Sequence, residues 1–196
     1  MRLRLIIMNV LLTCYGVVAW CQVQPGNAVD LGLSVMWADR NVGAMGPVEA
    51  GRVFGYGDIT GEEISTKYDD YVSEDVGGTD RDAANHYWGL GWRLPSISEI
   101  TELVERCQWT WTQRDGVDGY VVKGRGGNSI FLPVTGHRTD STMCFVKTRG
   151  YYWSGEITSY NKNYAGALFF YKGNKFQKDY RKIYGFAIRP VRESFF

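Results

Sequence analysis

The chain has 196 residues, 44% of them hydrophobic, and a formal net charge of +1. This length is enough for one domain with a substantial core. The near-neutral balance argues against a nucleic-acid partner, because such partners select clustered positive charge. Length and charge together predict a globular domain and exclude a strongly basic nucleic-acid-binding protein.

Residues 1–21 have the pattern of a secretory signal peptide. Two arginines precede an apolar run over residues 5–19, and a small-x-small cleavage site ends at Cys21. The run is short and mixed for a membrane span, and an uncleaved anchor is the alternative. We therefore expect an exported protein (periplasmic, cell-surface or secreted) with a leader at 22–28, a domain at 29–196 and no membrane span in the mature chain.

The first part of this domain alternates between apolar and polar residues. The alternation predicts a strand with an internal turn at 29–41 and a short strand at 52–59. The inward residues of the first strand are Val29, Leu31, Leu33, Val35 and Trp37.

Residues 60–82 form a predicted acidic loop that holds Asp69, Asp70, Glu74, Asp75, Asp80 and Asp82. A calcium site needs several oxygen ligands that converge, and the spacing here does not match an EF-hand. A solvated loop is the favoured interpretation, and calcium stays a hypothesis without a predicted site.

An amphipathic helix is predicted after Pro95. Ser96 occupies the N-cap and Glu99 follows three residues later, so that the two can form a capping box. The apolar residues behind the cap recur at helical spacing, and they are Ile97, Ile100, Leu103, Val104 and Cys107. One face of this helix should therefore lie on the core.

Most of the remaining chain is predicted to form strands. They span residues 108–112, 120–123, 129–134, 151–154, 164–171, 176–180 and 183–191, and residues 136–150 form a polar loop. Gly173-Asn174 predicts a tight hairpin. The strand after it should expose Lys175, Gln177, Asp179 and Arg181 on one side, and the last strand should turn Tyr184, Phe186 and Ile188 inward.

Two tryptophans, Trp109 and Trp111, share one side of a predicted strand. Aromatic faces suit sugar rings, so the pair could form a stacking platform. The favoured alternative is that they cover the core of a small β-rich domain.

The sequence predicts no catalytic or metal-binding residue and no cofactor beyond the calcium hypothesis. Neither His86 nor His137 has a second histidine or a cysteine at ligand spacing, and no motif joins a nucleophile to a base. Cys107 and Cys144 could form one disulfide or remain free thiols.

A candidate recognition surface lies between the C-terminal strands. Tyrosines supply contact area and Asn or Gln supply adaptable hydrogen bonds, as in antibody-like surfaces, although an ordinary solvated hairpin has the same composition. The candidate ligand-binding residues are Tyr160, Asn161, Asn163, Tyr164, Asn174, Lys175, Gln177, Lys178, Tyr180 and Arg181, and Lys182 follows them.

An ordered series of motifs also carries a family resemblance. The motifs are W-G-x-x-W-R-L-P-S-x-x-E at 88–99, C-x-W-x-W at 107–111, G-N-S-I-F-L-P-V-x-G-x-R at 127–138, Y-Y-W-S at 151–154 and Y-G-F-A-I-R-P-V at 184–191. Over residues 29–191 the chain resembles the Fibrobacter succinogenes major paralogous domain family. The R-L-P-x-x-x-E and G-F-x-x-R-P-V segments are also similar to the formylglycine-generating-enzyme and C-type-lectin-like superfamily.

This resemblance implies an α+β, C-type-lectin-like single domain with short, mostly antiparallel strands and a few helices. It brings no settled activity, and the paired cysteines of the sulfatase-modifying relatives have no match here. We therefore expect a secreted or surface-exposed binding module that recognises a glycan or a protein through the C-terminal hairpin face. The alternatives are a structural cell-envelope protein without a small ligand and an enzyme with an unrecognised cleft.

Overall fold

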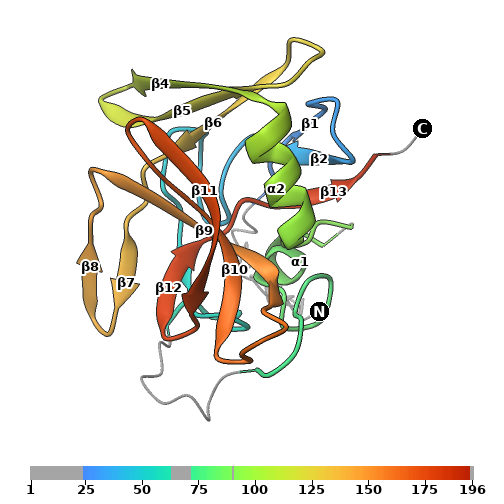
Figure 1. Cartoon of the computed structure of the whole chain (residues 1–196), viewed down its shortest axis with the longest axis vertical. Helices are drawn as coiled ribbons and strands as arrows, with labels where there is room; N and C mark the ends of the chain where they lie inside the picture. Colours follow the sequence, from blue (N-terminus) through green and yellow to red (C-terminus); the bar gives the residue numbers. More distant parts are fainter. Residues whose placement is uncertain (1–23, 63–71, 90, 195–196) are drawn as a thin grey trace, which may run out of the picture.

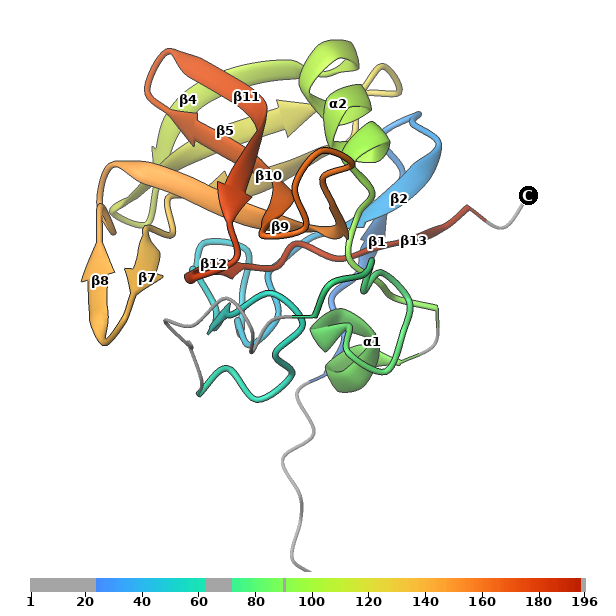
Figure 2. The ribbon, with the colours of Figure 1, turned by 60° about the horizontal axis from the view of Figure 1, so that its bottom comes forward.

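The computed structural model describes residues 24–62, 72–89 and 91–194. The predicted signal peptide and Asp69 and Asp70 of the acidic loop lie outside these residues. The described residues form three sheets and two short helices (Figure 1, Figure 2), and one strand pair alone is parallel among those described. The predicted α+β class with mostly antiparallel strands is therefore confirmed.

The largest sheet has seven strands and contains most of the C-terminal half of the chain. Its order is β11-β10-β9-β12-β7-β8, and β3 also pairs with β12. The strands are β3 (Val53–Phe54), β7 (His137–Thr139), β8 (Thr142–Cys144), β9 (Arg149–Ile157), β10 (Tyr164–Tyr171), β11 (Asn174–Arg181) and β12 (Tyr184–Ala187). As predicted, β10 and β11 form a tight hairpin, with Tyr171 paired to Asn174 and Gly173 at a φ of 91°.

Two smaller sheets of three strands each complete the β structure. One contains β1 (Ala28–Val29), β2 (Val35–Ala38) and β13 (Val191–Glu193), so that it joins the two ends of the described chain. The other is a meander of β4 (Gln108–Arg114), β5 (Val117–Lys123) and β6 (Ser129–Pro133), which lies at the top of Figure 1. The predicted inward residues Leu31, Val35 and Trp37 are buried, whereas Val29 and Leu33 are half-buried.

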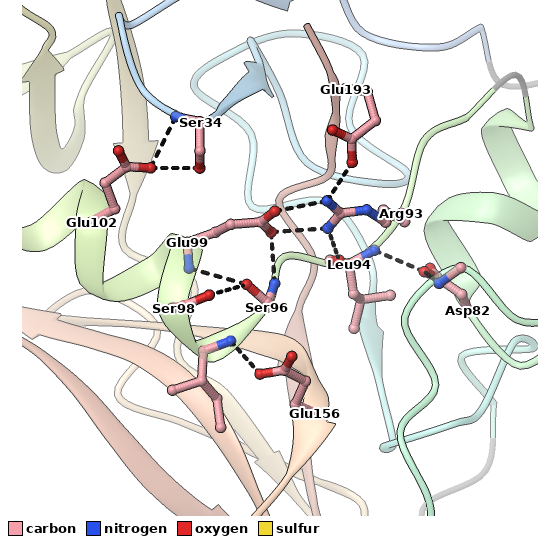
Figure 3. Close-up of polar contacts among 12 residues, drawn as sticks. Ser34, Asp82, Arg93, Leu94, Ser96, Ser98, Glu99, Glu102, Glu156 and Glu193 are labelled. Atoms are coloured by element: carbon pink, nitrogen blue, oxygen red, sulfur yellow. Dashed lines mark hydrogen bonds and ion pairs between the residues drawn. The ribbon is translucent and has the colours of Figure 1, made fainter.

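Helix α2 (Ile97–Arg106) begins at the predicted cap. The Ser96 hydroxyl accepts the Glu99 amide at 3.1 Å, and the Glu99 carboxylate accepts the Ser96 amide at 2.8 Å. Arg93 then donates to both Glu99 oxygens, at 2.7 and 2.9 Å, and to Glu193 at 2.8 Å (Figure 3). The conspicuous R-L-P-S-x-x-E motif therefore fixes the helix start to the turn before it and to β13.

A second helix, α1 (Ala83–Trp88), directly follows the segment predicted as an acidic loop. It begins at Asp82, whose buried carboxylate accepts the backbone amides of Ala84 and Asn85 as an N-cap and those of Gly78 and Leu94 across the loop. Burial raises the pKa of Asp82, and the four amide hydrogen bonds oppose this shift. Asp82 thus organises local structure instead of facing solvent.

The hydrophobic core is divided by strands β9 and β10, which bury side chains on both faces. Tyr152, Leu168 and Phe170 face α2 and the β4–β6 sheet, while Tyr151 and Phe169 face the opposite way, toward β12. The approach of α2 is close, because a Cβ at Gly166 would lie 2.4 Å from the Ile97 Cγ1 atom. One face of the β9–β11 region is therefore covered by α2.

Two predictions of secondary structure were wrong. Residues 136–150, expected to be an irregular loop, contain the β7–β8 hairpin, which projects at the left of Figure 1 and turns at Asp140 with a φ of 49°. The single strand predicted at 183–191 is interrupted at residues 188–190, where the chain leaves the large sheet and enters the small one. Pro190 has no amide to donate at this crossing, and Arg189 turns into the core.

Candidate functional site

An aromatic cleft lies on the face of the large sheet that α2 does not cover. Its volume is about 590 Å³, within the range of small-ligand sites. Strands β7, β9, β10, β11 and β12 all contribute to its wall, although β11 and β7 are separated by three strands in the sheet order. The sheet must therefore curl, which brings side chains from distant strands around one hollow. The lining residues are His137, Thr139, Phe145, Arg149, Tyr151, Phe169, Tyr171, Lys178, Tyr180, Tyr184 and Phe186.

Several rings in this cleft pack edge to face on one another, while Tyr184 and Phe186 are stacked. Tyr180 lies 5.6 Å from Tyr151 and 5.2 Å from Phe186 between ring centroids, both near right angles. His137 lies 4.8 Å from Tyr151 and 5.2 Å from Tyr184 in the same manner. These contacts hold the wall in one arrangement, since His137, Tyr151 and Tyr180 each pack on two or more other rings.

Two positively charged side chains, Arg149 and Lys178, also line this aromatic cleft. The Arg149 guanidinium lies 3.9 Å from the centroid of Phe145 and donates a long hydrogen bond of 3.5 Å to the Tyr151 hydroxyl. The Lys178 ammonium lies 5.7 Å from the centroid of Tyr180. The lining contains no Asp or Glu. The cleft is therefore both aromatic and positively charged.

His137 and Tyr180 contribute neutral side chains at neutral pH. Burial, with a smaller contribution from Arg149, lowers the pKa of His137, and its Nδ1 atom has no hydrogen-bond partner among the described residues. Burial also raises the pKa of Tyr180, with Tyr151 adding to the shift. No hydrogen bond joins either residue to a hydroxyl or thiol nucleophile among the described contacts.

The ten predicted ligand-binding residues do not share one surface. Lys178 and Tyr180 line the aromatic cleft, whereas Asn174 and Lys175 line a different hollow. Gln177 is on the α2 side of β11, where its amide donates to Asp179 at 3.2 Å. The prediction that Lys175, Gln177 and Asp179 are exposed together was wrong, because they are half-buried on that side, and only Arg181 of the four is fully exposed.

The other predicted residues lie at the β9–β10 connection. Asn161 forms a turn, with its side chain accepting the Asn163 amide at 2.9 Å. Tyr160 is 70% exposed and donates to Asp179 at 3.0 Å, and Arg181 donates to the Tyr164 hydroxyl at 3.2 Å. These residues form an exposed polar patch at the opposite end of the hairpin from Asn174.

Lys182, which followed these candidates in the sequence, is not a surface residue. It is 1% exposed and its ammonium donates to the Val72 carbonyl. Burial lowers its pKa, with a smaller contribution from Lys162.

A second hollow, of about 490 Å³, lies between the β4–β5 strands and the tip of the β10–β11 hairpin. It is lined by Trp109, Trp111, Tyr120, Lys172, Gly173, Asn174 and Lys175. Trp109 also packs on Phe170 of the core and donates to the Leu103 carbonyl, and the Lys175 ammonium lies 5.9 Å from its ring centroid. The tryptophans therefore cover the core, as favoured, while their outer edges line a hollow.

A third hollow, of about 280 Å³, adjoins the cap of α2, and its lining includes the charged residues Asp75, Arg93, Glu99 and Glu156. Its charged groups are already engaged, since Arg93 pairs with Glu99 and the Glu156 carboxylate accepts the Ile97 amide at 2.7 Å (Figure 3). Burial opposes ionisation of Glu99, but the Arg93 hydrogen bonds outweigh it and lower the pKa of this carboxyl. These contacts stabilise structure, and Asp75, which also lines the hollow, accepts the Ile157 amide at 2.9 Å.

The described part of the chain contains no cluster of metal-ligating side chains and no disulfide. No three His, Cys, Asp or Glu side chains of the described residues lie together as a metal site would require, so the calcium hypothesis still has no position. Of the two alternatives for Cys107 and Cys144, the structure has both as free thiols.

Sequence reasoning missed most of the aromatic cleft. Tyr151 and Phe169 were assigned to strands and Tyr184 and Phe186 to an inward face, while His137 lay in a predicted loop. The sequence held no clear signal for these residues, because aromatic residues on a strand can line a cleft or fill a core with the same alternation.

Comparisons with protein families, with curated proteins and with solved structures find no match to this chain. Among the described residues, no helix is long and apolar enough to span a membrane. The function is therefore inferred from the geometry of the site.

Proposed function

We propose that this protein is an exported binding module that recognises a glycan or another protein through its C-terminal hairpin face. The aromatic cleft carries this proposal, since it presents several rings and two cations in a hollow of ligand size. A C-type-lectin-like fold within the Fibrobacter succinogenes major paralogous domain family is part of the proposal and agrees with the mostly antiparallel sheets.

The rigidity of the cleft supports a binding role. Most of its side chains belong to paired strands of one sheet. Because such a scaffold is rigid, less conformational entropy is lost when a ligand binds. Tyr171 and Phe145 are 37% and 47% exposed at its edge and offer ring faces to a ligand. The apolar C–H face of a sugar ring packs well on such electron-rich faces.

The predicted residues outside the cleft do not extend its surface. Tyr160 and Arg181 form a polar patch at the far end of β11. Asp179 and Arg181 face the α2 side of that strand, opposite to Lys178 and Tyr180 in the cleft. Of the predicted residues, the proposal therefore depends on Lys178 and Tyr180.

A glycan and protein array probed with residues 22–196 tests the proposal. A ligand found there should bind more weakly to Tyr171→Ala by about 1–2 kcal/mol, because an aromatic anchor is lost from an exposed edge. Tyr180→Ala is less suitable, since Tyr180 is half-buried among other rings and its loss would also reduce stability. Absence of any ligand would favour the structural cell-envelope alternative.

A further inference from the structure

The geometry points to an acidic sugar, a pyranose ring that carries a carboxylate, as the ligand of the aromatic cleft. This inference rests on the proposed binding function and narrows it to one chemical class. Three features of the cleft support it: its charge, the chemistry of its donors and the position of its exposed rings.

The charged residues that line the cleft are all positive. Arg149 at the start of β9 and Lys178 in β11 both reach the cleft, and no lining residue is acidic. Among the described residues, neither cation takes part in an ion pair. Each instead lies over an aromatic ring, Phe145 or Tyr180, and apart from the long Arg149–Tyr151 hydrogen bond no hydrogen bond of these two cations is described. Charges beside apolar rings are screened less than charges in water, so an anion is favoured here.

The donors favour a carboxylate over a phosphate. Phosphate sites commonly use backbone amides at helix N-termini or glycine-rich loops. Here most lining residues belong to sheet strands, and no helix of the described chain contributes to the lining. The planar Arg149 guanidinium can pair with two oxygens of either anion, so the preference for a carboxylate rests on the strand-built lining.

The exposed aromatic rings of the cleft indicate that the rest of the ligand has an apolar face. Tyr171 and Phe145 are exposed at the edge of the cleft and Phe169 lies in its wall, 5.7 Å from Tyr171 between centroids. These faces can cover the apolar side of a pyranose ring while its carboxylate reaches the cations. A uronic acid, in which a carboxylate replaces the exocyclic alcohol, combines both features in one residue.

The test measures binding of a panel of uronate oligosaccharides, each paired with its carboxyl-reduced neutral form. Calorimetric titration at low and high salt should show tighter binding of the acidic member, with affinity falling as salt rises. Lys178→Gln and Arg149→Gln should each weaken binding of the acidic member about tenfold and leave the neutral member nearly unchanged. Lys123→Gln, at an exposed position of β5, removes the same charge elsewhere and should have no effect.

Thermal melts of the variants separate binding from folding. Lys178 is exposed, so Lys178→Gln stays informative even if loss of the Arg149–Phe145 contact reduces stability. Equal affinity for acidic and neutral forms, or binding of neutral glycans or proteins alone, would overturn the acidic-sugar inference and leave the proposed function standing. Failure of the wild-type chain to bind any glycan or protein would overturn the proposed function itself.

Discussion

Arg189 tests what joins the two smaller sheets to one another. It is fully buried, yet no carboxylate of a described residue hydrogen-bonds to it. Its guanidinium donates to Asn41 Oδ1 at 2.7 Å, to the Ala38 carbonyl at 3.0 Å and to the Phe131 carbonyl at 2.9 Å. Burial lowers its pKa to about 10, so the side chain is still a cation at neutral pH. The hydrogen bonds of the Arg189 guanidinium therefore join β2, the loop after β2 and β6.

Arg189→Met removes these donors and keeps most of the volume. A hydrogen bond from a charged donor contributes roughly 1.5–3 kcal/mol, and each buried acceptor left without a partner costs about 1–3 kcal/mol. Release of the buried charge offsets part of this loss, because burying an ion carries a desolvation penalty of several kcal/mol. We therefore expect a loss of about 3–5 kcal/mol out of a total of about 5–15 kcal/mol.

Urea unfolding followed by tryptophan fluorescence measures this loss as a shift in midpoint at constant slope. Arg189→Lys should be nearly as destabilised, because one ammonium cannot reach three separated acceptors. Arg125→Met, in an exposed turn, is the matched control and should stay within about 0.5 kcal/mol of the wild type. A loss under about 1 kcal/mol for Arg189→Met would show that the desolvation cost cancels the three hydrogen bonds and would refute the reasoning.

Three further predictions concern stability. Ser96→Ala removes the helix cap and should cost about 0.5–2 kcal/mol in a urea melt, and an unchanged midpoint would contradict the energetic role of the cap. The pKa of His137 is below its unfolded value of 6.5, so the unfolded chain binds the extra proton and stability should fall as the pH drops through about 6.5. His137→Phe should reduce the loss of folding stability between about pH 7 and 5.5, and equal losses of stability in both proteins would contradict this prediction. Gly166→Ala places a Cβ 2.4 Å from Ile97 and should cost about 1–3 kcal/mol, while Gly126→Ala, which meets no atom within 4 Å, should cost little.

Local features of the fold could be predicted from the sequence. The cap of α2 depends on Ser96 and Glu99 alone, and the β10–β11 hairpin on a glycine between two regular strands. Helix α1 was missed because six residues are too few for a helical period to stand out. The β7–β8 hairpin was missed because short polar strands carry little alternation.

The candidate site could be predicted only in part. Lys178 and Tyr180 were found, because polar and aromatic residues cluster on β11. Tyr151 and Tyr184 were not, since strand alternation cannot tell a ring that lines a cleft from one that fills a core. Strand β11 is an edge strand with polar residues on both faces, so alternation also failed to show that Gln177 lies on the side of α2.

The placement of β12 and β13 has a consequence for biosynthesis. β12 is the strand that joins β7 and β3 to β9, and β13 completes the sheet of β1 and β2. Both strands lie in residues 184–193, so the ribosome makes them after every other described element. A nascent chain that ends before residue 184 lacks the pairing that closes either sheet, and its apolar strands stay open to chaperones and proteases. Native folding of these sheets therefore begins only after β13 has been synthesised.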